Sequence, residues 1–280
     1  MAVLLALCSA AVYGAGDFFG GLSSRRAPAL LVVGGSQLVG LVVALVLALA
    51  MGGHLTPADA AWAAAGGITG AAGLGIFYRA LADGSMSVVA PVTAVCAAAV
   101  PVLAGLSGGD VVGAPALAGL VIALPAVGLV ARERAAGARL DLRTVAVALL
   151  AGTLFGTFFV MLHETSQGSG LWPVVVARLA SSGAVAVLLV ARWRVRRVAP
   201  LLPRPAVPLV VAAGIADMSA NVLYLLAVRQ GQLSIVGLLA SLYPVSTVLL
   251  ATLLLRERLS RLQLVGVGGC TLAVVLIATG

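Results

Sequence analysis

Asp217, Asn221 and Tyr224 stand at intervals of four and three residues inside one long apolar segment, residues 208–229. In an α-helix this spacing places the three polar side chains on one face. Asp217 lies about nine residues, or roughly 14 Å, into the segment, near the middle of a bilayer. A carboxylate at that depth can exchange a proton for a cationic or zwitterionic solute, or it can serve as a bonding partner that holds helices together.

Arg178 is a second charged residue inside an apolar segment, residues 171–191. An unpaired guanidinium inside a membrane helix is costly, so Arg178 needs a partner. Asp217 is the candidate in the same half of the chain. The pair would either bind a carboxylate-bearing solute or lock the helices together, and both interpretations stay open.

Asp17 is the third charged candidate. It lies late in the apolar segment 2–21, one helical turn after Tyr13. It can act as a second coupling acid. Because it is near the end of its segment, it can also be hydrated and pair with Arg25 or Arg26.

Tyrosines supply aromatic faces for cations and hydroxyls for polar groups. We expect four of them to line a solute cavity: Tyr13, Tyr78, Tyr224 and Tyr243. Gln37 is a weaker candidate in another apolar segment.

Three prolines inside apolar segments each remove a backbone hydrogen bond and can kink a membrane helix. We expect them to act as hinges: Pro91, Pro101 and Pro244.

Motifs of intramembrane hydrolysis are missing from the sequence. There is no HExxH, and the residues before Ser169 lack the first glycine of a Gly-x-Ser-Gly motif. The cysteines Cys8, Cys96 and Cys270 fall singly inside apolar runs, without the spacing of a metal site or disulfide framework. We therefore expect no catalytic residue, no metal site and no cofactor.

The elements that must position these residues are membrane helices. The chain of 280 residues is 62% hydrophobic and 9% charged, with a mean hydropathy of +1.17, far outside the soluble range. At about 20 residues per span, the sequence predicts an all-α membrane protein with ten transmembrane helices. The expected spans are 2–21, 29–51, 60–82, 86–106, 113–131, 144–163, 171–191, 208–229, 233–255 and 261–279.

Charge gives the expected orientation. The 17 basic residues are all arginines, and fifteen of them follow the odd-numbered spans. Basic loops face the cytoplasm, so both termini are expected on the outer side. The arginine-only, alanine-rich composition suggests a bacterial inner-membrane protein, and the arginines form no aromatic-laced patch for nucleic acid.

The two halves of the chain repeat each other. Residues 84–130 align without a gap on 231–277, placing Ser87 on Ser234 and Asp110 on Glu257. We expect a first five-helix repeat at 1–131, a cytoplasmic linker at 132–143 and a second repeat at 144–280. Because each repeat has an odd number of spans, the second is inverted, an arrangement typical of transporters that open a midplane site alternately to each side.

Residues 243–259, which read Tyr-Pro-Val-Ser-Thr-Val-Leu-Leu-Ala-Thr-Leu-Leu-Leu-Arg-Glu-Arg-Leu, resemble a motif of the EamA family in the drug/metabolite transporter superfamily. The Tyr13-Gly14 pair and Arg178 fit the same family. The resemblance implies two five-helix repeats and the exchange or export of small organic solutes. Asp17 is similar in location to a first-helix carboxylate of related small multidrug transporters.

Together these observations predict a secondary transporter that exports or exchanges amino-acid-like metabolites or drugs by alternating access, with protons as the candidate coupling ion. We expect a midplane cavity walled by spans one, three, four, six, eight and nine, in a protein surrounded by membrane lipids. A lipid-linked sugar flippase and a non-transporting membrane sensor or assembly protein are the alternatives. The sequence leaves a monomer and a homodimer equally open.

Overall fold

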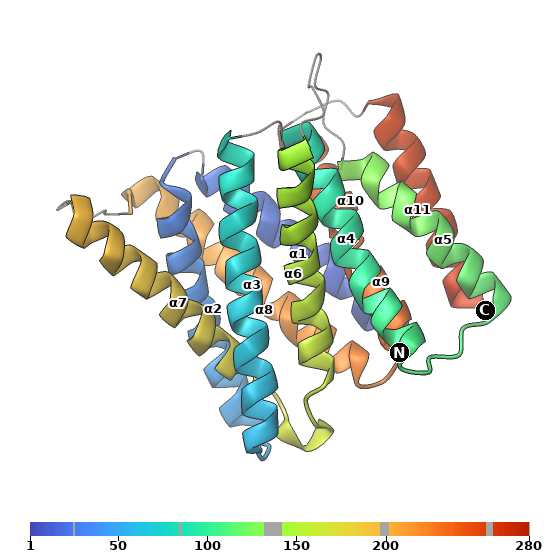
Figure 1. The fold of residues 1–280 in the computed structure, drawn as a ribbon, viewed down its shortest axis with the longest axis horizontal. Helices are drawn as coiled ribbons and strands as arrows, with labels where there is room; N and C mark the ends of the chain where they lie inside the picture. Colours follow the sequence, from blue (N-terminus) through green and yellow to red (C-terminus); the bar gives the residue numbers. More distant parts are fainter. Residues whose placement is uncertain (25, 84–85, 132–141, 197–201, 256–259, 280) are drawn as a thin grey trace.

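The computed structural model describes residues 1–24, 26–83, 86–131, 142–196, 202–255 and 260–279, and the long elements in these ranges are α-helices (Figure 1). In chain order they are α1 (Ala2–Ser24), α2 (Ala29–Met51), α3 (Pro57–Asp83), α4 (Met86–Ser107), α5 (Ala114–Ala131), α6 (Leu142–His163), α7 (Trp172–Arg196), α8 (Val207–Val228), α9 (Leu233–Ala240), α10 (Tyr243–Leu255) and α11 (Arg261–Thr279). Short 3-10 turns, η1 (Gln167–Ser169) and η2 (Arg204–Ala206), precede α7 and α8.

Hydropathy accounts for these helices. Among the described residues, seven helical stretches are long and apolar enough to cross a membrane, and three shorter helical stretches are apolar as well. In lipid the backbone must satisfy its own hydrogen bonds, which a helix does within itself. The protein is therefore an all-helical, multi-pass membrane protein within the described ranges, as the sequence predicts.

The segment expected as one helix over 233–255 is instead two helices, α9 and α10, separated by a turn at Ser241 and Leu242. Pro244 stands in the first turn of α10 and has no N–H to donate to the preceding turn, so a continuous helix would lose a bond there. The Gly237 carbonyl accepts from the Ser241 N–H at 3.1 Å and from its hydroxyl at 2.8 Å. Both helices still belong to one apolar stretch, Leu233–Leu254.

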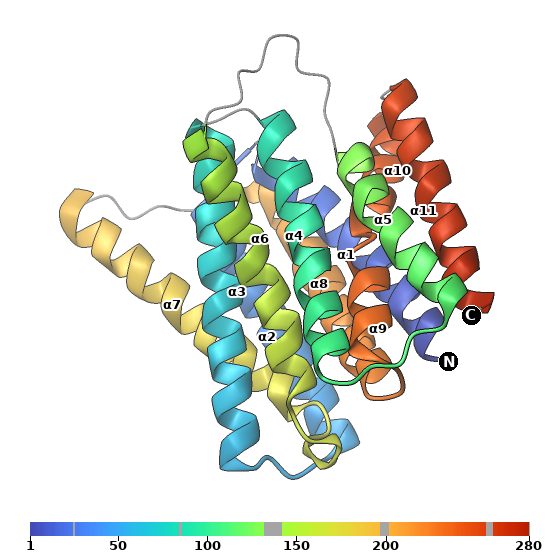
Figure 2. The ribbon, with the colours of Figure 1, turned by 45° about the vertical axis from the view of Figure 1, so that its right-hand side comes forward.

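The connections gather at two ends of the bundle (Figure 2). Both termini lie at one end, with the connections 52–56, 108–113, 164–171 and 229–232; we call this the terminus end. The opposite end, which we call the arginine end, carries the connection 25–28 and the residues just before α6, α8 and α11. The arginines described there are all exposed: Arg26, Arg143, Arg194, Arg204 and Arg261.

Each half of the chain packs mainly against the other half. α1 lies against α8 and α10, just as α6 lies against α3 and α4, and α2 contacts α8 as α7 contacts α3. The remaining major pairs join α2 to α7, α4 to α9 and α5 to α11. The Ser9 hydroxyl donates to the Ala220 carbonyl at 2.8 Å and ties α1 to α8. The packing is thus reciprocal between the halves.

Glycines allow the helices of the two halves to approach closely. A Cβ at Gly14 would lie 2.0 Å from the Ser246 hydroxyl oxygen on α10. At Gly156 on α6, a Cβ would lie 2.5 Å from Val100 Cβ on α4. Both contacts exclude any larger side chain unless the neighbouring helix moves.

Candidate functional site

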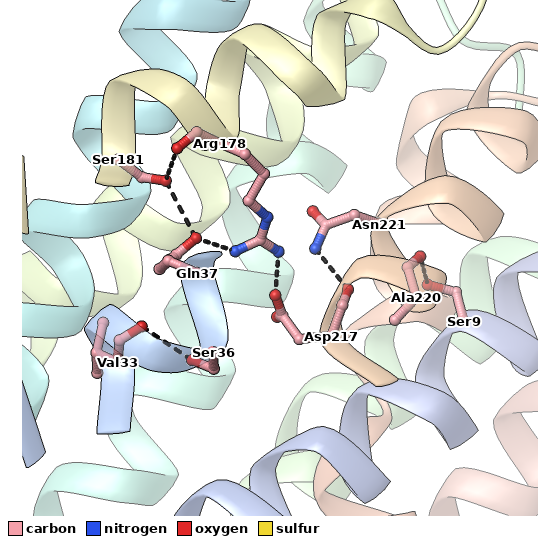
Figure 3. A network of polar contacts seen from close by, with 9 residues as sticks. All are labelled: Ser9, Val33, Ser36, Gln37, Arg178, Ser181, Asp217, Ala220 and Asn221. Carbon is pink, nitrogen blue, oxygen red and sulfur yellow. Dashed lines mark hydrogen bonds and ion pairs between the residues drawn. The ribbon is translucent and has the colours of Figure 1, made fainter. Parts of the chain in front are cut away.

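Arg178 on α7 and Asp217 in the middle of α8 form an ion pair inside the bundle (Figure 3). Nη2 of the guanidinium donates to Oδ2 of the carboxylate. The Arg178 side chain is 11% exposed, whereas 39% of the Asp217 side chain is exposed. The partner expected for Arg178 from the sequence is confirmed, and one side of the carboxylate is accessible.

A third helix, α2, supplies a further hydrogen-bond partner for Arg178. Gln37 on α2 is buried, and its Oε1 accepts a hydrogen bond from Nη1 of Arg178. The Ser181 hydroxyl, one turn along α7, lies 3.1 Å from the same amide oxygen (Figure 3). One neutral amide and one carboxylate therefore bond the guanidinium, and Ser181 bonds the amide in turn, which gives the buried charge the partners it requires.

Two glycines make room for the guanidinium between α2 and α8. A Cβ at Gly40 would lie 3.5 Å from Nε of Arg178, and a Cβ at Gly214 would lie 2.6 Å from the Ser36 carbonyl oxygen. The sequence made Gln37 a weaker candidate than the charged residues. Gly40 lies one turn from Gln37 on the same face of α2 and leaves room there for a neighbouring side chain. This spacing could have marked Gln37 as a site residue.

Asp17 on α1 lies beside the Asp217 segment of α8. A Cβ at Gly16 would be 3.2 Å from the backbone nitrogen of Asp217, and the two carboxylates interact electrostatically. The Asp17 side chain is exposed. Within the described ranges it has no hydrogen-bond or ion-pair partner, Arg26 included, while Arg25 lies outside them. Asp17 is therefore the accessible carboxylate without a bound cation.

The face of α1 that carries Ala6, Tyr13 and Asp17 varies in exposure along its length. Ala6 is fully buried, Tyr13 is half-buried and Asp17 is exposed. Gly20, further along, is buried again, although a Cβ there would meet no atom within 4 Å. Cys8 is also exposed, but it lies on the opposite face of α1 from Asp17. On this face of α1, Asp17 is thus the exposed residue next to the ion pair.

Aromatic rings border the site toward the terminus end. The Tyr13 ring lies edge-on to Phe159 with 6.0 Å between ring centres, and it is tilted against Tyr243 at 6.4 Å. Tyr224 is fully buried and donates its hydroxyl to the Phe159 carbonyl at 3.0 Å. The Tyr13 hydroxyl is buried without a hydrogen-bond partner among the described residues. Tyr13 thus keeps a polar group available, whereas Tyr224 joins α8 to α6.

Asn221 follows Asp217 by one turn of α8. It is buried, and its Nδ2 donates to the Asp217 carbonyl at 2.7 Å (Figure 3). The amide is therefore bonded to its own helix, next to the ion pair.

Of the expected hinge residues, Pro101 is buried in α4 and faces α9, because a Cβ at Gly237 would lie 2.4 Å from Pro101 Cβ. The side chains of Tyr78, Pro91 and Pro244 lie outside the described residues. Pro125 also lies inside a helix, α5, and sequence reasoning left it aside.

The expected cavity walls omitted α2 and α7, which supply Gln37 and Arg178. A groove of about 500 Å³ lies elsewhere, between α1, α10 and α11, with a mostly apolar lining that includes Leu7, Leu249 and Val274. None of the ion-pair residues lines it. In the part of the chain that the structure describes, no three His, Cys, Asp or Glu side chains come together as metal ligands would.

Apolar helices around a largely buried ion pair are the features of a multi-pass membrane protein with charged groups in its interior. Residues 142–279 match the model of the EamA-like transporter family. A solved structure described only as "Crystal structure of protein" has 17% identity and a TM-score of 0.79, covering 99% of this chain and 98% of its own. At that identity the likeness concerns the fold alone. No curated protein matches the sequence.

Proposed function

We propose that the protein is a secondary transporter that exports or exchanges small cationic or zwitterionic organic solutes, such as amino-acid-like metabolites or drugs, by alternating access. The observation that carries this proposal is the accessible Asp17 and Asp217 pair beside one guanidinium in the middle of the bundle. Intramembrane ionisable groups are costly and mark solute or proton pathways. The match of residues 142–279 to the model of a transporter family supports the same function.

The charges of the site favour a solute with an amine. Arg178 is already bonded to Asp217 and Gln37, so a solute carboxylate would have to displace one of them. Asp17 has no such partner among the described residues, and an ammonium group would neutralise it. The nearby Tyr13 ring offers an aromatic face for a cation. A proton on either carboxylate would compete with the solute, which is the basis of proton-coupled exchange.

The reciprocal packing of the two halves supports an inverted pair of five-helix repeats, 1–131 and 144–280. In such a pair the halves exchange conformations and open the site alternately to each side. The arginine end would face the cytoplasm of a bacterial cell, with both termini on the outer side of the inner membrane. The site would then be loaded from the cytoplasm, in the direction of export.

The test is solute flux by purified protein in liposomes with an imposed pH gradient, using amino acids and cationic dyes. Wild type is compared with Asp217→Asn and with Glu164→Gln, a carboxylate change at an exposed loop position. We expect flux that follows the gradient, is lost in Asp217→Asn and is kept in Glu164→Gln. Flux that is unchanged in Asp217→Asn would make the ion pair structural. A folded protein that moves no solute would favour the flippase or sensor.

A further inference from the structure

The terminus end is held together by polar contacts between the two halves of the chain. Asp59, in the first turn of α3, is buried and accepts two hydrogen bonds from Ser166. The Ser166 N–H lies 2.6 Å from Oδ1, and the Ser166 hydroxyl lies 2.9 Å from Oδ2. Asp59 also caps its own helix, because its Oδ2 accepts from the Thr56 N–H at 3.1 Å while the Thr56 hydroxyl oxygen accepts from the Asp59 N–H at 3.1 Å. One carboxylate thus starts α3 and anchors the connection 164–171.

Arg229, just after α8, holds the other side of this connection. Its Nη2 donates to the Ser166 carbonyl and to the Ser169 hydroxyl, both at 2.9 Å, and its Nη1 donates to the Gly170 carbonyl at 2.7 Å. Burial lowers the pKa of the Arg229 guanidinium, and the Asp59 carboxylate opposes that shift. Ser166 therefore lies between an anion of the first half and a cation of the second.

A second contact joins the halves at the start of α9. Oδ2 of Asp110 accepts from the Ser234 N–H at 2.9 Å and from the Ser234 hydroxyl at 2.7 Å. Next to it, Nε2 of Gln232 donates to the Val111 carbonyl at 2.7 Å. A Cβ at Gly105 would come within 2.3 Å of Asp110 Oδ2, so this contact needs a glycine on α4. Charge-assisted bonds of this kind are stronger than bonds between neutral groups.

The core beneath these contacts is closed. Ala6, Leu225, Ala227 and Leu239, which lie between the ion pair and the terminus end, are fully buried. Toward the arginine end, by contrast, the inner face of α1 is exposed at Asp17. The bundle is therefore closed at the terminus end and less tightly closed near Asp17. In alternating access, each state is closed at one end and open at the other.

We propose that Asp59 and Asp110 are latches that hold the terminus end shut, and that the structure is the state open to the arginine end. This inference rests on the proposed transport function and adds the contacts that control it. To release solute at the terminus end, Asp59 must separate from Ser166, and Asp110 must separate from Ser234. Loss of either carboxylate shifts the population toward the state that is open at the terminus end.

Two cysteine probes report the two states without any transported solute. Ala6→Cys is buried on the terminus side of the site. Gly20→Cys lies on the arginine side, at a buried glycine where an added Cβ would meet no atom within 4 Å. Each probe is placed in protein whose native cysteines, Cys8, Cys96 and Cys270, are replaced. Labelling by a water-soluble thiol reagent is timed in lipid nanodiscs, where both faces are accessible. The variants compared are Asp59→Asn, Asp110→Asn and their combination.

We expect each latch variant to raise the Ala6→Cys labelling rate by about tenfold and to slow labelling of Gly20→Cys, with a larger effect in the double variant. Glu164→Gln, in the same connection, should change neither rate. Thr56→Ala, which removes the helix cap but keeps Ser166 on Asp59, should also leave both rates near wild type. Unchanged rates in both latch variants, or equal increases at both probes as in a loosened fold, would overturn the latch.

The readout separates this inference from the proposed function. Opposite shifts of the two probes in a protein that moves no solute would retain the latch and reject transport. Solute flux with unchanged probe rates would retain transport and reject the latch.

Discussion

Asp217 accepts a hydrogen bond from Arg178 and yet leaves 39% of its side chain exposed. The guanidinium is buried and is held from its other side by Gln37. One face of the carboxylate is therefore fixed, while the other is available to a proton or a solute. The exposed Asp17 lies on the neighbouring helix α1, beside the segment of α8 that carries Asp217.

The ion pair leads to a prediction about the free energy of unfolding. Arg178→Met leaves Asp217 without its cation, and we expect it to lower the free energy of unfolding by about 2–3 kcal/mol, less than for a fully buried pair because Asp217 is partly exposed. In Arg178→Met/Asp217→Asn no charge is left unpaired, and most of the loss should be recovered. Thermal unfolding in detergent measures both, with Arg194→Met at an exposed position as control. Equal losses in the single and double variants would contradict this account.

Gln37 is expected to matter for transport although it carries no charge. Gln37→Leu removes the acceptor that Arg178 and Ser181 share, so the guanidinium loses its second anchor. We expect flux to fall by about tenfold, corresponding to roughly 1–2 kcal/mol for a hydrogen bond to a charged group. Ser36→Ala is the matched control, because among the described residues the Ser36 hydroxyl bonds to the Val33 carbonyl of its own helix alone. Similar flux in both variants would exclude Gln37 from the site.

Tyr13 and Tyr224 are expected to respond differently to loss of the hydroxyl. Tyr13→Phe removes a group that bonds to no described residue, so stability should stay within about 0.5 kcal/mol while the solute KM rises. Tyr224→Phe removes the bond to the Phe159 carbonyl and should cost about 1 kcal/mol of stability. Flux kinetics and thermal unfolding of the two variants check both parts. A Tyr13→Phe protein with unchanged KM would place Tyr13 among the packing residues.

Gly67 tests the close packing of α3 on α7. A Cβ at Gly67 would lie 2.2 Å from the Ala177 carbonyl oxygen, so Gly67→Ala should destabilise the protein by about 1–3 kcal/mol. A Cβ at Gly183 on α7 would meet no atom within 4 Å, and Gly183→Ala should be neutral or stabilise the helix by up to about 1 kcal/mol. Thermal unfolding of the two variants measures the difference, and midpoints that shift equally would argue against the contact.

Much of the helical architecture could be predicted because lipid imposes it. Every expected span contains a helix, since long apolar runs leave the backbone no other way to bond in a membrane. The Arg178 and Asp217 pair could be predicted because a guanidinium in lipid needs an anion. Pro244 also indicates a break in the helix, but the continuous apolar run over residues 233–255 predicts a single span.

The contacts of Asp59 and of Gln37 could not be predicted, because their partners are far away in the sequence. Asp59 and Ser166 are separated by 107 positions, the first in the opening turn of α3 and the second in the connection after α6. Their partnership follows only from how α3 packs against α6 and α7. Gln37 likewise gains its role from α7, which the expected cavity walls omitted.

The bond from Ser9 to the Ala220 carbonyl has a consequence for biosynthesis. The two residues are 211 positions apart, and most neighbours of α1 belong to the second half of the chain. The first helix therefore leaves the ribosome long before the surface that covers it exists. We expect α1 to stay beside the insertion machinery, or to sit in lipid only loosely packed, until α8 is synthesised. Neither half should form a stable membrane domain when it is produced alone.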